Sequence, residues 1–297
     1  MKILKIFGYV AFFFFCLALG IYFTFPWTAA ADRALQFASE KARQNGTRLE
    51  IEARDVKPSF LTGLVAHDLA VKFEAYEHPI VLQRLDARAH FWKMIRGLIG
   101  VSASVPIAKG TLDLSVAEDG DEFEVQALAK QIELALVPTL GDATGVPLSG
   151  ELALDSNVRW SPKDPKKTEG ELKIKMTNIE TLKGAKIMGV LLPELVLGNG
   201  ELTLPIEKGK VRFDKQRFGG ENLEVVVDGE ILLNKKLALS TLALVLSFKP
   251  TPALLKKEPL IGAMLGGLSN AKGADGFYSF SVTGPGRAPR FQPRKRA

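Results

Sequence analysis

Apolar and polar residues alternate one by one along most of the chain, which is the period of a β-strand with one face toward solvent. The alternation is clearest in residues 111–116, 171–176, 201–204 and 211–215. We therefore expect a mainly β fold, in which a long antiparallel sheet of roughly a dozen strands is strongly twisted or curled.

A short repeat supports this interpretation. A glycine followed by alternating apolar residues begins at Gly110, Gly150, Gly170, Gly200 and Gly229, at spacings of 40, 20, 30 and 29 residues. These spacings are close to multiples of the length of one short strand with its turn, as in an antiparallel meander. Four dipeptides then predict turns between strands: Asp119-Gly120, Asn199-Gly200, Asp228-Gly229 and Asp275-Gly276.

Helical periodicity is confined to a few segments. We expect a short helix over Thr28–Arg43, an amphipathic helix over Asp86–Leu98, and a third helix over Pro252–Leu268, with Thr251 as its cap. Helices this few cover a long sheet only in part. An apolar sheet face left partly open would form a groove.

A run of twenty uncharged residues, Ile6–Phe25, precedes these elements. As a helix it would be about 30 Å long, which is enough to span a bilayer once. Lys2 and Lys5 precede the run, so the positive-inside rule predicts a cytoplasmic N-terminus and a body on the opposite side of the membrane. The alternative is a cleaved signal peptide with a cleavage site at Ala29–Ala31, but the apolar run is longer than the core of such peptides.

The remaining organisation follows from these boundaries. We expect residues 1–27 to form the cytoplasmic start and transmembrane anchor, residues 28–284 a β domain beyond the membrane, and residues 285–297 a basic, disordered tail. A stretch rich in proline and lysine, Ser161–Lys167, divides the β domain into possible halves, 28–160 and 168–284.

Charge is distributed unevenly along the 297 residues. The net charge of +6 comes from the two ends, which leave 32 basic and 33 acidic residues between them. The body therefore lacks the basic excess needed to bind nucleic acid. The five basic residues of the tail favour a solubilising role, and the alternative is contact with acidic lipid or an acidic partner.

Candidate chemistry is sparse. His67, His78 and His90 do not have the spacing of metal ligands, and the one cysteine, Cys16, lies in the apolar run. The chain has no G-x-S-x-G motif and no phosphate-binding loop, and the acidic cluster around Gly120 is explained by a solvated turn. We expect neither an enzyme nor a metal or other cofactor.

The dry face of the predicted strands is the remaining candidate site. Such a face is either ordinary core or an apolar groove that accommodates acyl chains or apolar protein segments. The candidate groove lining comprises eight residues: Leu172, Ile174, Leu202, Leu204, Val225, Val227, Leu242 and Leu244.

Two stretches carry a resemblance to known families. The segment RLEIEARDVKPSFLTGLVAHDLAVKF, which follows the anchor and the first helix, resembles the opening of AsmA-like proteins. The segment from Gly200 to Pro252, followed by a helix and then DGFYSFSVTGPGRAPRFQP, is similar to the type II secretion system protein N family, GspN.

This resemblance implies a single-pass inner-membrane protein with a periplasmic β domain, associated with type II secretion and contacting other secretion subunits. It supplies no active-site residues. The first hypothesis is a non-enzymatic interaction module of the secretion machine. The alternative, implied by the AsmA-like kinship, is a protein that binds or transfers phospholipid in the apolar groove.

Overall fold

The computed structural model describes residues 49–59, 62–73, 79–137, 146–184, 193–286 and 288–294, with isolated positions at 141, 186–187, 190–191 and between 29 and 43. The expected membrane span, Ile6–Phe25, lies outside the described residues, as does His78. Within the described part, no helix is both long and apolar enough to cross a bilayer. Every described position between 29 and 43 is helical, as expected for Thr28–Arg43.

Fifteen strands form one antiparallel sheet, and β10 pairs with β11 in a separate hairpin. The strands are β1 (Leu49–Glu52), β2 (Asp55–Ser59), β3 (Gly63–Phe73), β4 (Ile80–Ala89), β5 (Gly100–Ile107), β6 (Gly110–Asp119), β7 (Glu122–Glu133), β8 (Leu148–Trp160), β9 (Glu169–Thr181), β10 (Lys186–Ile187), β11 (Val190–Leu191), β12 (Val196–Glu207), β13 (Lys210–Gly219), β14 (Leu223–Leu232), β15 (Thr241–Pro250), β16 (Tyr278–Pro285) and β17 (Arg290–Pro293).

Apart from the helical positions between 29 and 43 and at 141, the helices of the described residues are few and short. They are α3 (Phe91–Ile95), α5 (Pro252–Lys257) and α6 (Pro259–Gly266), with 3-10 turns η1 (Leu134–Leu136), η2 (Pro165–Lys167), η3 (Leu237–Leu239) and η4 (Ser269–Ala271). This mainly β composition confirms the expected fold class.

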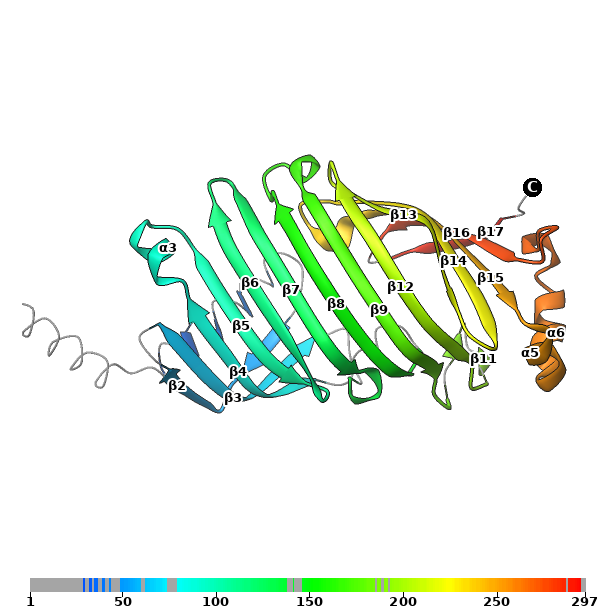
Figure 1. The fold of residues 1–297 in the computed structure, drawn as a ribbon, viewed down its shortest axis with the longest axis horizontal. Coiled ribbons are helices and arrows are strands. Elements are labelled where there is room, and N and C mark those ends of the chain that lie inside the picture. The colour runs from blue at the N-terminus through cyan, green and yellow to red at the C-terminus, as the bar shows by residue number, and fades with distance from the viewer. Residues whose placement is uncertain are drawn as a thin grey trace, which may run out of the picture.

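The sheet is a meander that curls at both ends. Its order is β1-β3-β4-β5-β6-β7-β8-β9-β12-β13-β14-β15-β16-β17, and β2 continues β1 along the same edge of β3. In Figure 1, β16 and β17 lie behind β13 and β14, and the first strands turn behind β5 at the opposite end. The sheet stays continuous across the turn at Ser161–Lys167, since β8 and β9 pair along most of their length.

Two of the four expected turns are wrong. Asp119-Gly120 joins β6 to β7, and Asp275-Gly276 lies in the turn before β16. Asn199-Gly200 instead lies inside β12 and Asp228-Gly229 inside β14. The physical reason is close packing between strands: a Cβ on Gly229 would lie 2.3 Å from the Ala243 carbonyl oxygen, and the register of β12 shifts around Gly198. Here glycine marks an irregular position within a strand rather than a hairpin.

The expected helix over Asp86–Leu98 is also wrong over its first part. Residues up to Ala89 belong to β4, and only Phe91–Ile95 are helical. Asp86, Ala87, Arg88 and Ala89 alternate polar and apolar, and pairing with both β3 and β5 satisfies their backbone groups.

The C-terminal helix forms in two pieces. Thr251 caps α5 by accepting a hydrogen bond from the Leu254 backbone N–H (3.3 Å), as expected for Thr251 before Pro252. Pro259 at the start of α6 ends α5, because proline cannot continue the helical hydrogen bonds. Within the tail expected to be disordered, Arg290–Pro293 form β17 and pair with β16, which corrects that expectation for these four residues.

Candidate functional site

The eight residues expected to line a groove lie on one face of the sheet. Leu172 is the cross-strand partner of Leu204, and Ile174 is the partner of Leu202. Partner residues in an antiparallel pair point to the same side of the sheet. Ile206 of β12 pairs with Val211 of β13, which pairs with Ile231 of β14, and Ile231 pairs with Leu242 of β15, so all these residues lie on the same face. Val225, Val227, Leu242 and Leu244 follow on the same side. We call this side of the sheet the apolar face.

Burial differs along the apolar face. Leu202, Leu204, Ile206 and Val211 are buried and form a hydrophobic cluster, against which Leu172 and Ile174 pack. Val225 is also buried, whereas Val227, Leu242 and Leu244 are half-buried. The central residues are therefore core, and those toward β15 retain accessible apolar surface.

The apolar face extends well beyond the eight expected residues. One row across the sheet is continuous from β3 to β12, and its members are Leu64, Ala87, Ala103, Leu114, Ala127, Ser156, Leu172 and Leu204. Four of the eight members are alanine or serine and lie on strands β4 to β8, whereas the members on β9 and β12 are leucine. The N-terminal part of this row, from β4 to β8, therefore consists mostly of small side chains.

The sequence analysis missed this N-terminal part, although its alternation gave the signal. Leu112, Leu114 and Val116 alternate with polar residues in β6, and the register places them on the apolar face with Ala129, Ala127 and Val125 of β7. Alanine contributes weakly to an apolar pattern, so the sequence did not show that these small side chains belong to the apolar face.

Helix α6 covers the C-terminal end of the apolar face. Leu265 of α6 and Ala271 of η4 form a buried cluster with Tyr278, and Phe248, Phe280 and other partly buried apolar residues pack against it. The ring of Phe248 stacks on those of Tyr278 (5.7 Å between centroids) and Phe280 (6.0 Å). The apolar face is thus closed by packed side chains at this end.

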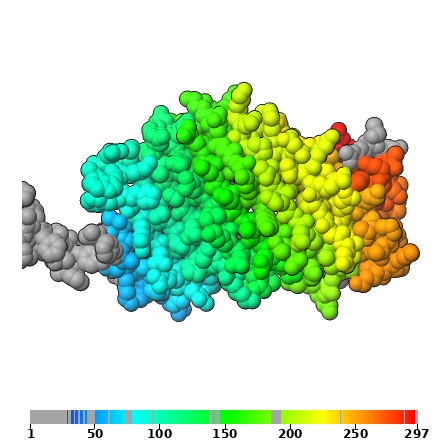
Figure 2. All heavy atoms as spheres, in the orientation of Figure 1, coloured from blue at the N-terminus to red at the C-terminus, as the bar shows by residue number. Residues whose placement is uncertain are grey.

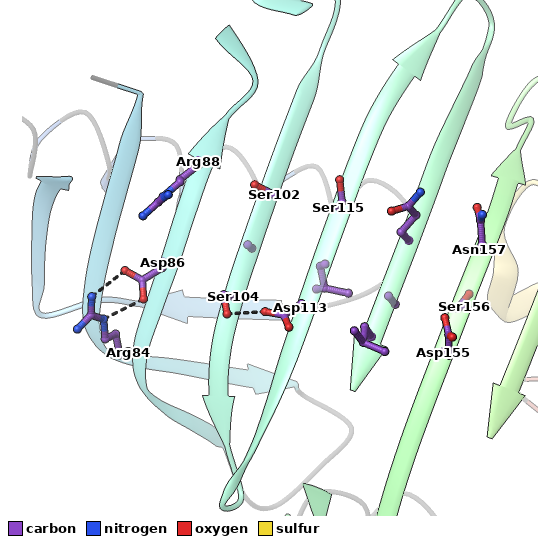
Figure 3. Close-up of a pocket in the computed structure, with 15 residues that line it drawn as sticks. Arg84, Asp86, Arg88, Ser102, Ser104, Asp113, Ser115, Asp155, Ser156 and Asn157 are labelled. Carbon is purple, nitrogen blue, oxygen red and sulfur yellow. Dashed lines mark hydrogen bonds and ion pairs between the residues drawn. The ribbon is translucent and has the colours of Figure 1, made fainter. Parts of the chain in front are cut away.

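The opposite, polar face carries a hollow of about 710 Å³ across five strands, β4 to β8, and it is open toward solvent. Figure 3 shows the charged and hydroxyl side chains around it. Arg84 donates two hydrogen bonds to Asp86 (2.9 and 3.0 Å), and the Ser104 hydroxyl donates one to Asp113 (2.5 Å). Asp155 lies on the far side of the hollow. The sequence analysis did not predict this site, because it depends on the register of five strands.

Ion pairs set the electrostatics of the polar face. The hydrogen bond to the Asp86 carboxylate and the negative charge of Asp86 raise the pKa of the Arg84 guanidinium. The hydrogen bond to Glu171 (2.9 Å) and the Glu171 charge likewise raise the pKa of Lys173 on β9. These groups are solvent-exposed and mutually neutralised, which is typical of a stable polar surface.

Side chains that bind metal ions do not gather in the described residues. No cluster of three or more His, Cys, Asp or Glu side chains that could hold a metal ion is found in that part of the chain. His67 lies on β3 and His90 follows β4, so these two do not share a strand or helix. The acidic residues around Gly120 belong to the β6–β7 turn, where Asp121 pairs with Lys163.

Comparison with known proteins gives one match. The family model described as type II secretion system protein GspN-like, Synergistales, matches residues 5–184. No curated protein and no solved structure matches the chain. The matched region covers more than half of the chain and includes the strands β1 to β9, and family membership supports a role related to type II secretion. The chain belongs to the type II secretion system protein GspN-like family.

Proposed function

We propose that the protein is a non-enzymatic component of the type II secretion system, anchored in the inner membrane by Ile6–Phe25, with its curled sheet in the periplasm. Its partners are other secretion subunits. The family match carries this proposal. The uncharged twenty-residue run after Lys2 and Lys5 supports the anchor and its orientation.

The C-terminal edge of the sheet is the proposed contact with other subunits. β17 ends the strand order, and all four of its residues are exposed. A strand at a sheet edge presents backbone N–H and C=O groups that can pair with another chain. Phe291 adds an exposed aromatic side chain beside the basic Arg290 and Arg294.

Cysteine accessibility tests the anchor. In a Cys16→Ser background, Thr111→Cys places a thiol on an exposed position of β6, and Ile3→Cys places one before the apolar run without removing a charge. With the outer membrane permeabilised and the inner membrane intact, a membrane-impermeant maleimide should label Thr111→Cys. It should label Ile3→Cys only after the inner membrane is lysed. The reverse pattern would refute the proposed orientation.

Photo-crosslinking tests the contact in cells that assemble the secretion machine. A photoreactive amino acid at Phe291 should crosslink to secretion subunits, and the same group at Lys235, exposed between β14 and β15, should not. Deleting the gene should impair secretion of a folded substrate, and the Lys235 variant should restore it. Equal crosslinking at the two positions would leave β17 without a specific partner.

Lipid binding is the second candidate, and the half-buried part of the apolar face favours it. Val227, Leu242 and Leu244 retain accessible apolar surface on the inner side of a curled sheet. Acyl chains are long, thin and apolar, so they fit such a surface without requiring polar partners.

Two neighbouring residues of β15 provide a matched pair for testing it. Leu244 points to the apolar face, and the exposed Ala243 points to the opposite face. Full-length wild type and Ala243→Asp should co-purify with stoichiometric phospholipid, measured by native mass spectrometry and lipid extraction, and Leu244→Asp should lose it while keeping its circular dichroism spectrum. Lipid-free wild-type protein would reject this candidate and leave the secretion role intact.

A further inference from the structure

Exposed large apolar residues concentrate in one short segment of the described chain. Phe91, Trp92, Ile95, Ile99 and Val101 fall within eleven consecutive positions, and Trp92 is 76% exposed. They belong to α3, to its connection with β5 and, for Val101, to the start of β5, and we call them the α3 patch. Figure 1 shows α3 beyond the ends of β4 and β5, and Figure 2 shows this region as the cyan projection at the left end of the molecule.

The α3 patch is held in a defined conformation. The Ile99 backbone N–H donates to the Glu118 carboxylate (2.8 Å), and the Glu118 N–H donates to the Ile99 carbonyl (2.7 Å). Lys93 Nζ donates to the Glu118 carbonyl (3.0 Å). The rings of Phe91 and Trp92 pack edge to face at 5.6 Å. A turn held by hydrogen bonds therefore exposes the aromatic side chains to solvent, although exposing apolar area to water is unfavourable.

The composition of the segment matches the interface of a bilayer. Trp, Phe and Ile are combined with Lys93 and Arg96, and residues 87–112 contain no acidic residue. The adjoining β6–β7 turn supplies the nearby carboxylates. The Glu118 carboxylate accepts a hydrogen bond from the Ile99 N–H, Asp121 pairs with Lys163, Glu122 lies 3.8 Å from Arg159, and Asp119 is exposed. Aromatic side chains partition to the headgroup region, and adjacent Lys and Arg are attracted by anionic lipid.

The position of the segment agrees with this chemistry. Gln36, Ser39, Glu40 and Arg43 line one hollow together with Glu50–Glu52 of β1. Eleven positions separate Phe25 from Gln36, so the end of the apolar run stays within about 40 Å of this residue even if fully extended. α3 follows β4, which belongs to the same end of the sheet as β1.

We infer that the α3 patch is a second membrane contact, which inserts Phe91, Trp92, Ile95 and Ile99 into the surface of an anionic bilayer beside the anchor. The occupant is the lipid interface itself, bound by apolar insertion and by the charges of Lys93 and Arg96. This inference rests on the proposed anchoring by Ile6–Phe25. It would fix the orientation of the sheet relative to the membrane, which a single membrane span does not.

Fluorescence of the full-length protein in nanodiscs tests the inference. An environment-sensitive dye is attached in turn to the native Cys16, to Ile95→Cys and to Lys235→Cys, the last two in a Cys16→Ser background. The nanodiscs contain phosphatidylglycerol and lipids with a doxyl quencher. Dye at position 95 should show blue-shifted emission and quenching by the doxyl lipid, and dye at position 235 should show neither. Lys93→Glu with Arg96→Glu should reduce the quenching at position 95.

The dye at Cys16 separates this inference from the anchoring on which it rests. Quenching at Cys16, with position 95 no more quenched than position 235, would overturn the α3 contact and leave the anchor intact. Absence of quenching at both Cys16 and position 95 would overturn the anchor as well.

Discussion

Leu204 of β12 lies directly opposite Leu172 of β9, and the Leu204 side chain is buried, at 3% exposure, although no helix of the described residues belongs to its buried cluster. The burial comes from neighbouring strands of the curled sheet, because Ile206, Val211 and Phe213 pack around the same point. The sheet thus makes a core from one of its own faces.

Replacing Leu204 with alanine should therefore lower the free energy of unfolding by about 2–4 kcal/mol, since it removes buried methyl groups and leaves a cavity. The matched change Thr203→Ala, on the polar face of the same strand, should cost less than about 1 kcal/mol. Urea denaturation of the two full-length variants measures both. Similar losses for the two variants would contradict a one-sided core.

Gly229→Ala should destabilise the sheet by about 2 kcal/mol or more, since Gly229 has a φ of +118° and a Cβ would lie 2.3 Å from the Ala243 carbonyl oxygen. Gly120→Ala is the control, because Gly120 has a φ of +65° in a turn with open space around it. It should cost about 1 kcal/mol. Thermal unfolding compares the two, and an equal shift would show that the contact with Ala243 relaxes freely.

The Asp121–Lys163 pair predicts a pH dependence. Lys163 Nζ lies 2.5 Å from the Asp121 carboxylate, and this hydrogen bond lowers the pKa of Asp121 below its ordinary value of 3.8. A lowered carboxyl pKa adds stability that is present above the ordinary value and is lost as the pH falls through the pKa of the folded protein. Both side chains are exposed, so salt should screen the effect.

NMR titration of Asp121 checks this expectation. Lys163→Met should return the Asp121 pKa toward its ordinary value, and added salt should do the same in the wild type. The stability difference between wild type and Lys163→Met should disappear at a pH below both values of the Asp121 pKa. A difference that persists there would have to come from packing of the lysine stem.

Glu118→Ala should loosen α3, because it removes the carboxylate that accepts the Ile99 backbone hydrogen bond. The expected cost is about 1 kcal/mol, and it should be local. Hydrogen exchange of residues 91–99 should accelerate, while that of β9 and β12 stays unchanged. Glu118→Gln retains an acceptor oxygen and should exchange more slowly than the alanine variant. Unchanged exchange in Glu118→Ala would mean that the turn is held by the backbone alone.

Alternation along the chain predicted the strands and the face on which their apolar residues lie. It succeeded because side chains alternate sides with a period of two, whatever the partner strand. Leu172 and Leu244 are far apart in sequence, and both were assigned to the dry side from their neighbours alone. The register between strands then placed them on one continuous face.

Predictions from short sequence patterns were wrong where the same pattern is compatible with two local structures. Asn199-Gly200 has the composition of a hairpin turn, but the Asn199 side chain accepts a hydrogen bond from the Asn178 backbone of the neighbouring strand (2.7 Å), within an irregular part of the pairing. The apolar residues before Phe91 fit both the helical period of about 3.6 residues and the strand period of two. Backbone pairing with both β3 and β5 favours the strand. The polar hollow depends on contacts among five strands, which no local pattern encodes.

The strand order has a consequence for how the sheet forms. Nearly every pairing joins strands that follow one another in the chain. The longest connections include residues 251–277 between β15 and β16, which contain α5, α6 and η4, and residues 182–195 between β9 and β12, which contain the β10–β11 hairpin. Most of the other connections are short, and short connections cost less entropy to close than the long crossovers of other sheet topologies. Each hairpin can add to an edge that already exists, so assembly can proceed from the first strand to the last as the chain is synthesised. For the same reason, the gain or loss of one hairpin would change the length of the sheet without altering the pairing of the remaining strands.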